Sequence, residues 1–86
     1  MKHLEKIFKA LANRRRLAIV FYLKRAPETN VGGIAAEIKL SLRATSRHLV
    51  QLERAGILEK EQRSKEVFYK CARSLILVIE NAIAEL

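Results

Sequence analysis

The chain has 86 residues, of which 50% are hydrophobic, and its 17 Lys and Arg against 9 Asp and Glu give a formal net charge of +8. This length suits one compact domain spanning residues 1–86, and no apolar run approaches the about 20 residues of a membrane-spanning helix. The excess of positive charge favours a polyanionic partner, either nucleic acid or an anionic membrane, and composition alone does not choose between them.

The cellular location follows from cysteine content and the N-terminal pattern. Cys71 is the only cysteine, which excludes an intramolecular disulfide. Glu5 and Lys9 interrupt any apolar segment near the N-terminus, so no signal peptide is expected. We therefore expect a cytoplasmic protein with no membrane partner.

Two amphipathic helices are predicted before Pro27. The first has apolar residues at spacings of three and four: Leu4, Ile7, Phe8 and Leu11. Asn13 is the expected cap of the second helix, because its side chain can accept a hydrogen bond from a first-turn amide. We expect its sequence pattern to run through Leu17, Val20, Phe21 and Lys24. Pro27 disfavours helical geometry at Ala26, so the helix should end before it.

A short helix, a tight turn and a second helix follow, which is the arrangement of a helix-turn-helix. The short helix is capped by Asn30, and its expected inner face is Val31, Ile34, Ala35 and Ile38. Gly32 and Gly33 each weaken it by about 1 kcal/mol, so packing must hold it. After a turn at Lys39 and Leu40, Ser41 caps the second helix, which should stop at Gly56. Its expected inner face is Leu42, Thr45, Leu49 and Leu52.

The opposite face of this second helix is basic. It carries Arg43, Ser46, Arg47, Val50 and Arg54. Arg43 and Arg47 are i, i+4 neighbours, and their repulsion disfavours the helix slightly unless an anion lies across them. Arginine is also the commonest bidentate partner of guanine in a DNA major groove. The alternative is a basic face that is simply solvated.

A β-hairpin and a last helix complete the chain. Residues 57–62 and 66–71 are predicted strands, and Arg63 and Lys65 lie near the hairpin tip, where they could reach phosphates or a minor groove. Ser74 caps the last helix, whose broad apolar face is Leu75, Ile76, Ile79, Ala82, Ile83 and Leu86. The predicted fold is mainly α with a β-hairpin wing: four helices, two strands and a fifth helix, a winged helix-turn-helix.

In this order of elements the sequence resembles the ArsR family of bacterial and archaeal winged-helix repressors. Residues 8–17 look like the family's opening helix junction, residues 40–58 like its recognition helix and exit, and residues 67–69 like the return strand of its wing. The middle stretch is the most specific, because Ser46, His48, Leu49 and Leu52 with the run 56–58 follow the family spacing.

The resemblance implies a sequence-specific regulator of transcription, a repressor, that binds a near-palindromic operator in double-stranded DNA as a homodimer. Its DNA-binding residues are expected to be Ser41, Arg43, Ser46, Arg47, His48, Gln51, Arg54, Arg63 and Lys65. Arg43 and Arg47 are the candidates for base contact, with Ser46 beside them, and Arg54 for phosphate contact. His48 is either a phosphate donor or a packing residue. Arg14 and Arg15 are weaker candidates for DNA contact.

The first and last helices usually form the dimer interface in this family. The corresponding apolar residues are Leu4, Ile7, Phe8, Leu11, Leu75, Ile76, Ile79 and Ile83. Burying such side chains stabilises an interface by roughly 1.5–3 kcal/mol each. The alternative is that both stripes complete the core of a monomer.

The sequence departs from the family where many relatives bind metal. Residues 29–33 lack a soft ligand, and the last helix offers Glu80 and Glu85 but no histidine. His3, His48 and Cys71 lie in three different elements, so we expect neither a metal site nor a cofactor. Cys71 is interpreted as a small buried residue, with a redox role as the alternative. Ser64 replaces the glycine that often turns the family's wing.

Two other classes of function remain for comparison. A winged helix can serve as a protein-interaction module, but Val50 is the one large apolar residue on the predicted recognition face. An enzyme is not expected, because the chain has no glycine-rich phosphate loop and no plausible nucleophile–base set.

Overall fold

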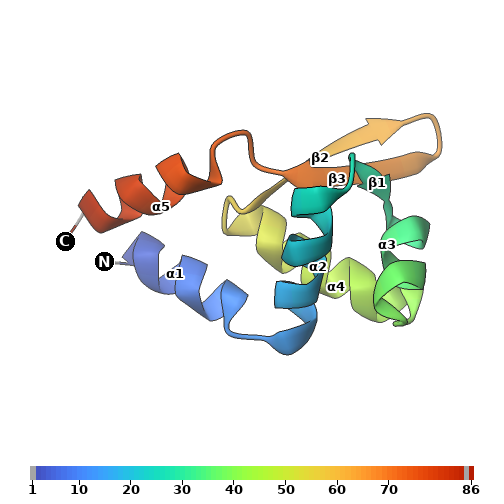
Figure 1. The fold of residues 1–86 in the computed structure, drawn as a ribbon, viewed down its shortest axis with the longest axis horizontal. Coiled ribbons are helices and arrows are strands. Elements are labelled where there is room, and N and C mark those ends of the chain that lie inside the picture. The colour runs from blue at the N-terminus through green and yellow to red at the C-terminus, as the bar shows by residue number, and fades with distance from the viewer. Residues whose placement is uncertain (1, 85) are drawn as a thin grey trace.

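The computed structural model describes residues 2–84 and 86 (Figure 1). The elements are α1 (Lys2–Leu11), α2 (Arg14–Arg25), β1 (Thr29–Asn30), α3 (Val31–Ile38), α4 (Leu42–Arg54), β2 (Leu58–Arg63), β3 (Glu66–Cys71) and α5 (Leu75–Ala84). This confirms the predicted winged helix-turn-helix, with one added strand. In Figure 1, α1 and α5 lie at one end of the molecule beside both termini, and the β2–β3 hairpin extends toward the other end.

The predicted N-caps are confirmed: Asn13, Asn30, Ser41 and Ser74 each accept a first-turn N–H through a side-chain oxygen. Asn30 Oδ1 accepts from the Gly33 N–H at 2.7 Å, and Ser41 Oγ accepts from the Ala44 N–H at 3.1 Å. These bonds satisfy amides that have no partner within the helix. The caps therefore fix where α3 and α4, the helix-turn-helix pair, begin.

The core lies where α2, α3 and α4 meet the inner ends of the strands, and it extends between α1 and α5. Its largest fully buried side chains are Ile7, Ile19, Ile34, Leu49, Leu52, Ile57 and Thr45. As predicted, α3 turns Ile34 and Ala35 inward and α4 turns Thr45, Leu49 and Leu52 inward. Leu42 was expected on that face of α4 but is 59% exposed, because the first turn of α4 lies at the edge of the molecule (Figure 1).

The expected pattern of α2 is also wrong in part. Val20 is buried, but its buried neighbours are Ile19 and Leu23, whereas Leu17 and Phe21 are 52% and 64% exposed. Apolar residues occur all along residues 17–23, so the sequence pattern does not select one face. The exposed ring of Phe21 is covered in part by the guanidinium of Arg25, which lies 4.7 Å from the ring centroid.

The sheet has three antiparallel strands in the order β1-β3-β2. The hairpin pairs Leu58 with Cys71 at its base and Arg63 with Glu66 near its tip. The strand β1 was not predicted, because two residues are too few to show a period. It pairs Thr29 and Asn30 with β3, and so attaches the start of α3 to the wing.

The close approach of β1 to α3 requires a glycine at position 33. A Cβ atom on Gly33 would lie 2.7 Å from Thr29 Cγ2 and 3.1 Å from the capping Asn30 Oδ1. Asn30 also donates from Nδ2 to Glu66 Oε1 at 2.6 Å. One side chain therefore caps α3 and holds the wing strand β3.

Left-handed backbone occurs at three points that bound these elements. Gly56 follows α4 with φ 80°, and Lys39 ends α3 with φ 58°. Ser64 turns the wing with φ 56°, the conformation that a glycine adopts most readily. The serine therefore keeps a glycine-like turn.

Among the described helices, none is long and apolar enough to cross a membrane.

Candidate nucleic-acid interface

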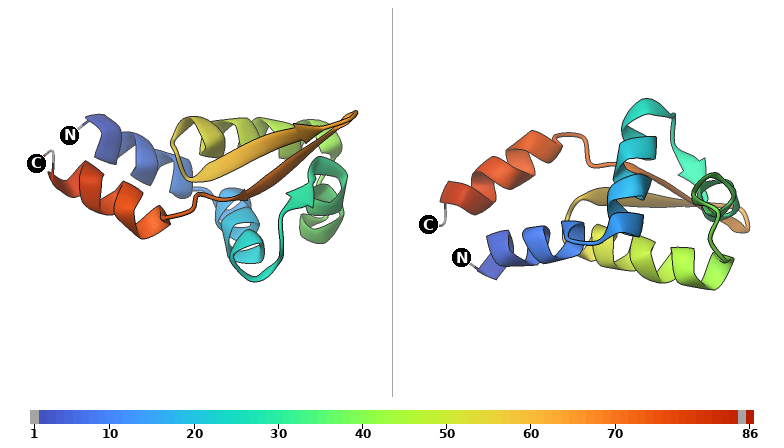
Figure 2. Two further views of the ribbon diagram at one scale, coloured as in Figure 1. Left: turned by 90° about the horizontal axis from the view of Figure 1, so that it is seen from above. Right: turned by 60° about the horizontal axis from the view of Figure 1, so that its bottom comes forward.

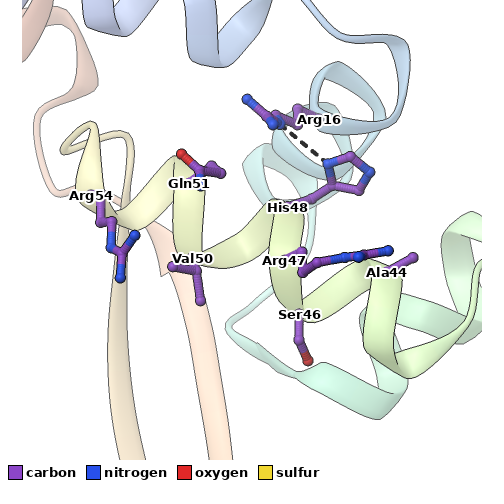
Figure 3. Close-up of a pocket in the computed structure, with 8 residues that line it drawn as sticks. All are labelled: Arg16, Ala44, Ser46, Arg47, His48, Val50, Gln51 and Arg54. Atoms are coloured by element: carbon purple, nitrogen blue, oxygen red, sulfur yellow. Dashed lines mark hydrogen bonds between the residues drawn. The ribbon is translucent and has the colours of Figure 1, made fainter.

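The outward face of α4 forms one side of a concave surface of about 580 Å³ (Figure 3). Its lining residues are Arg16, Ala44, Ser46, Arg47, His48, Val50, Gln51 and Arg54. Five of these were predicted from the sequence as DNA-binding residues, and they come from consecutive turns of one helix. Arg16, Ala44 and Val50 were not in the predicted set. Arg16 reaches the surface from α2, which only the tertiary structure reveals.

The arginines of α4 have no internal counterion. Arg43, Arg47 and Arg54 are exposed, and within residues 2–84 and 86 none of them forms an ion pair. Since α4 turns its other face into the core, these guanidinium groups project from a rigid support. An external polyanion is the partner that such a row of uncompensated cations attracts most strongly.

His48 occupies the border between α4 and α2. Arg16 donates from Nε to His48 Nδ1 at 3.2 Å and from Nη1 to the carbonyl oxygen of Ala10 at 3.4 Å (Figure 3). Partial burial lowers the pKa of His48, and the positive charges of Arg16, Arg47 and Arg15 lower it further. The imidazole is therefore neutral, with Nδ1 accepting and Nε2 carrying the proton. This arrangement places His48 in contact with Arg16, and the protonated Nε2 remains able to donate, so contact with a phosphate stays a prediction.

Of two further predicted residues, Gln51 lines the surface and Ser41 does not. Ser41 uses its hydroxyl oxygen to cap α4, and its hydroxyl proton remains able to donate. Gln51 is exposed and lines both the α4 surface and a second hollow beside α1. The apolar Val50 lies between the polar groups, where a thymine methyl is the base feature it suits.

The two basic residues of the wing have unlike surroundings. Lys65 is exposed at the tip. Arg63 forms ion pairs with Glu28 and Glu61, and its guanidinium lies 4.9 Å from the centroid of the Phe68 ring. The hydrogen bonds to Glu61 and Glu28 raise the pKa of Arg63. The bond between Arg63 and Glu61 also lowers the pKa of Glu61. The charge of Arg63 is thus compensated within the chain.

The residues predicted for a dimer interface divide into two groups. Leu4 and Ile7 are 9% and 0% exposed and belong to the core of a single chain, so in this conformation Ile7 offers no surface to a second copy. Leu11, Leu75 and Ile79 are partly buried against the same core. Three predicted residues remain largely exposed: Phe8, Ile76 and Ile83. Leu77 and Leu86, which were not in the predicted set, join them as exposed apolar side chains.

The candidate ligand and redox groups are dispersed. Among the described residues, no three His, Cys, Asp or Glu side chains are grouped as a metal site. Burial raises the pKa of the Cys71 thiol, against the opposing effect of Lys24. Its sulfur lies 3.9 Å from the Val20 carbonyl oxygen. The thiol is therefore protonated at neutral pH.

A helix-turn-helix pair followed by a β-hairpin wing defines the class of winged helix-turn-helix domains. The sequence model of the arsR family of bacterial regulatory proteins matches residues 13–60, which is more than half of the chain. The protein belongs to this family.

Individual relatives agree with this assignment. The transcriptional activator HlyU of Vibrio cholerae serotype O1 is 38% identical over 63 residues, which are 73% of this chain and 57% of HlyU. The chain thus spans less than two thirds of that relative. The regulator YgaV of Escherichia coli K12 is 26% identical over 79 residues, which are 87% of this chain and 80% of YgaV.

Solved structures show the same fold over nearly the whole chain. The homodimeric winged helix-turn-helix DNA-binding domain of Mb0332 from Mycobacterium bovis is 27% identical with a TM-score of 0.81, covering 98% of this chain and 79% of that one. HlyU from Vibrio cholerae N16961 is 30% identical with a TM-score of 0.78, covering 98% and 91%.

Proposed function

We propose that the protein is a non-enzymatic, cytoplasmic regulator of transcription that binds double-stranded DNA in a sequence-specific manner. The observation that carries this proposal is the row of exposed arginines on α4, which have no counterion among the described residues. A major groove admits one α-helix, and Arg47 and Arg43 then face base edges. Ser41, Ser46, Gln51 and Arg54 surround them as further contacts, and Lys65 reaches a phosphate from the wing.

We further propose that two copies act together on a near-palindromic operator. The support is the exposed apolar surface of α1 and α5, which comprises Phe8, Ile76, Leu77 and Ile83. A relative of the same fold, the Mb0332 domain, is homodimeric. An Ile76→Asp variant should be monomeric by sedimentation, because the new charge would be buried in the interface. Ile76 is exposed in the single chain, so the substitution leaves the core around Ile7 intact. An unchanged dimer would refute this assignment of the interface.

Repression is the proposed mode, because a bound dimer blocks access to the DNA that it covers. The proposal includes no metal, which agrees with the dispersed positions of the candidate ligands within the part of the chain that the structure describes. HlyU is named an activator, so a reporter gene placed behind the operator decides the sign of regulation. Higher expression in the presence of the protein would overturn repression and leave DNA binding intact.

The test of DNA binding begins by selecting bound duplexes from a random library and sequencing them. Half-sites separated by about one helical turn, or a multiple of it, are expected for a dimer. Arg47→Ala should then weaken specific binding by about 1–3 kcal/mol and relax base preference, whereas Lys65→Ala should mainly reduce the salt dependence. Lys24→Ala is the matched control, because Lys24 is exposed at the end of α2 beside Cys71, away from α4. Absence of salt-sensitive binding at low salt would refute the proposal and favour a protein-interaction module.

A further inference from the structure

A second basic hollow adjoins the surface of α4. It measures about 320 Å³ and lies between α1 and α4. Its lining residues are Lys2, Glu5, Lys6, Lys9, Ala10, Arg16 and Gln51. Arg16 and Gln51 also line the α4 surface, so the two hollows adjoin each other. Figure 2, right, shows α1 and α4 following one another in a row on the same side of the molecule.

The lysines of α1 form a stripe on this side. Lys2, Lys6 and Lys9 are spaced i, i+4 and i+7, so they share one face of the helix, opposite the buried Ile7. Lys9 pairs with Glu5 at 3.7 Å, but both side chains are well exposed, so the pair is weak. Lys2 and Lys6 form no ion pair with any residue that the structure describes. The hollow therefore keeps a positive charge despite Glu5.

The dimer contact proposed above fixes where this stripe would lie on DNA. Phe8 is on α1 and is exposed, so the α1 helices of two copies would lie near the two-fold axis. The helix has 10 residues and is therefore about 15 Å long, a length that corresponds to roughly four base pairs of B-DNA. It would extend each protein's contact from the end of α4 toward the centre of the operator.

We propose that Lys2 and Lys6 bind phosphates of the operator segment between the two half-sites. This inference rests on the proposed DNA-binding function and adds a contact region outside the helix-turn-helix and the wing. Lysine ammonium groups contact phosphates without reading bases, so these residues would position the dimer and raise affinity for any sequence at the centre. They would leave the base preference of α4 unchanged.

The experiment compares two doubly substituted proteins on the selected operator duplex. Lys2→Gln with Lys6→Gln removes the stripe. Lys24→Gln with Arg73→Gln removes the same charge from exposed positions that line the hollow beside Cys71. Binding is measured by fluorescence anisotropy between about 50 mM and 200 mM salt, where each phosphate contact contributes about 0.9 to the slope of log K against log salt. The stripe variant should lose about 3.6 from that slope, because each of the two copies loses two phosphate contacts. The control variant should keep the slope of the unaltered protein.

Two further arms keep the result interpretable. Lys2→Arg with Lys6→Arg should restore the slope, since arginine also binds phosphate; failure to restore it would indicate a structural effect on α1 and overturn the inference. On a duplex that ends at the inner edge of a half-site, the stripe variant and the unaltered protein should give equal slopes. A persistent difference there, or equal slopes for stripe and control variants on the full operator, would also overturn it. If the unaltered protein shows no salt-dependent binding, the proposed function itself fails.

Discussion

The arginines of α4 and the arginine of the wing look alike in the sequence but have opposite electrostatic surroundings. Arg43, Arg47 and Arg54 meet no carboxylate among the described residues, whereas Arg63 is paired with Glu28 and Glu61. Glu28 is remote from Arg63 in the chain and is brought to it by the pairing of β1 with β3. The charge of α4 is therefore uncompensated among the described residues, whereas part of the wing's charge is neutralised by carboxylates of the same chain.

The largest effect on stability is expected at Asn30, which joins the start of α3 to the wing strand β3. Asn30→Ala removes both the cap of α3 and the bond to Glu66, and should lower the free energy of unfolding by about 1–2 kcal/mol. Asn30→Ser keeps a capping oxygen and loses the donor to Glu66 without placing a second carboxylate beside it, so it should cost less. Urea denaturation of both variants provides the measurement. Equal losses would mean that the cap contributes nothing beyond the wing contact.

A second effect concerns the inner face of α4. Thr45 is fully buried, and within the described residues its Oγ1 has no hydrogen-bond partner. Thr45→Val replaces the hydroxyl by a methyl of similar size and should raise the free energy of unfolding by about 1 kcal/mol. Thr45→Ser retains the hydroxyl and leaves a small void, so it should be destabilising. Thermal unfolding distinguishes the two, and a destabilised valine variant would show that the hydroxyl has a partner.

A third prediction tests the compensation of the wing. Glu28→Gln removes one of the two carboxylates on Arg63 and leaves more of its positive charge for DNA, so affinity at low salt should increase. The increase should be roughly two- to five-fold only, because exposed ion pairs are weak. Glu59→Gln adds the same charge on the same hairpin without touching the Arg63 side chain, and serves as the control. Anisotropy titrations of both variants suffice. Equal gains in DNA affinity for the two variants would show that only net charge matters and that the pairing of Arg63 does not limit binding.

The smallest effect is a pH dependence at His48. Its pKa in the folded protein lies below the ordinary value of 6.5, first because of burial and then because of the neighbouring arginines. The neutral imidazole therefore contributes stability that is present above about pH 6.5 and is lost as the pH falls toward the lower folded pKa. His48→Gln keeps a neutral acceptor for Arg16 and should remove this part of the dependence. The measurement is the melting temperature of both proteins between about pH 7.5 and 5, the range in which histidine titrates. Parallel curves for both proteins would contradict it.

The sequence by itself determined the order of the five helices and the two wing strands, though not β1, and the limits of most helices. Capping residues act through hydrogen bonds to amides two or three residues away, and Pro27 and Gly56 act through local backbone geometry. Their effects can therefore be predicted from the local sequence. The buried residues of α4 were also predicted, because they recur at spacings of three and four along a mostly polar helix. Only Leu42 was wrongly placed on that face. The same clarity was missing in α2, where apolar residues occur on several sides and only packing chose Ile19 and Leu23.

The tertiary structure decided which charged groups are compensated and which apolar stripes are already used. The bond from Arg16 to His48, the strand β1 and the pairing of Glu28 with Arg63 all join segments that are distant in sequence. Residue spacing carries no record of such contacts, because they depend on how the elements pack. For the same reason the sequence did not separate Ile7, which is buried in the core, from Phe8, which remains exposed.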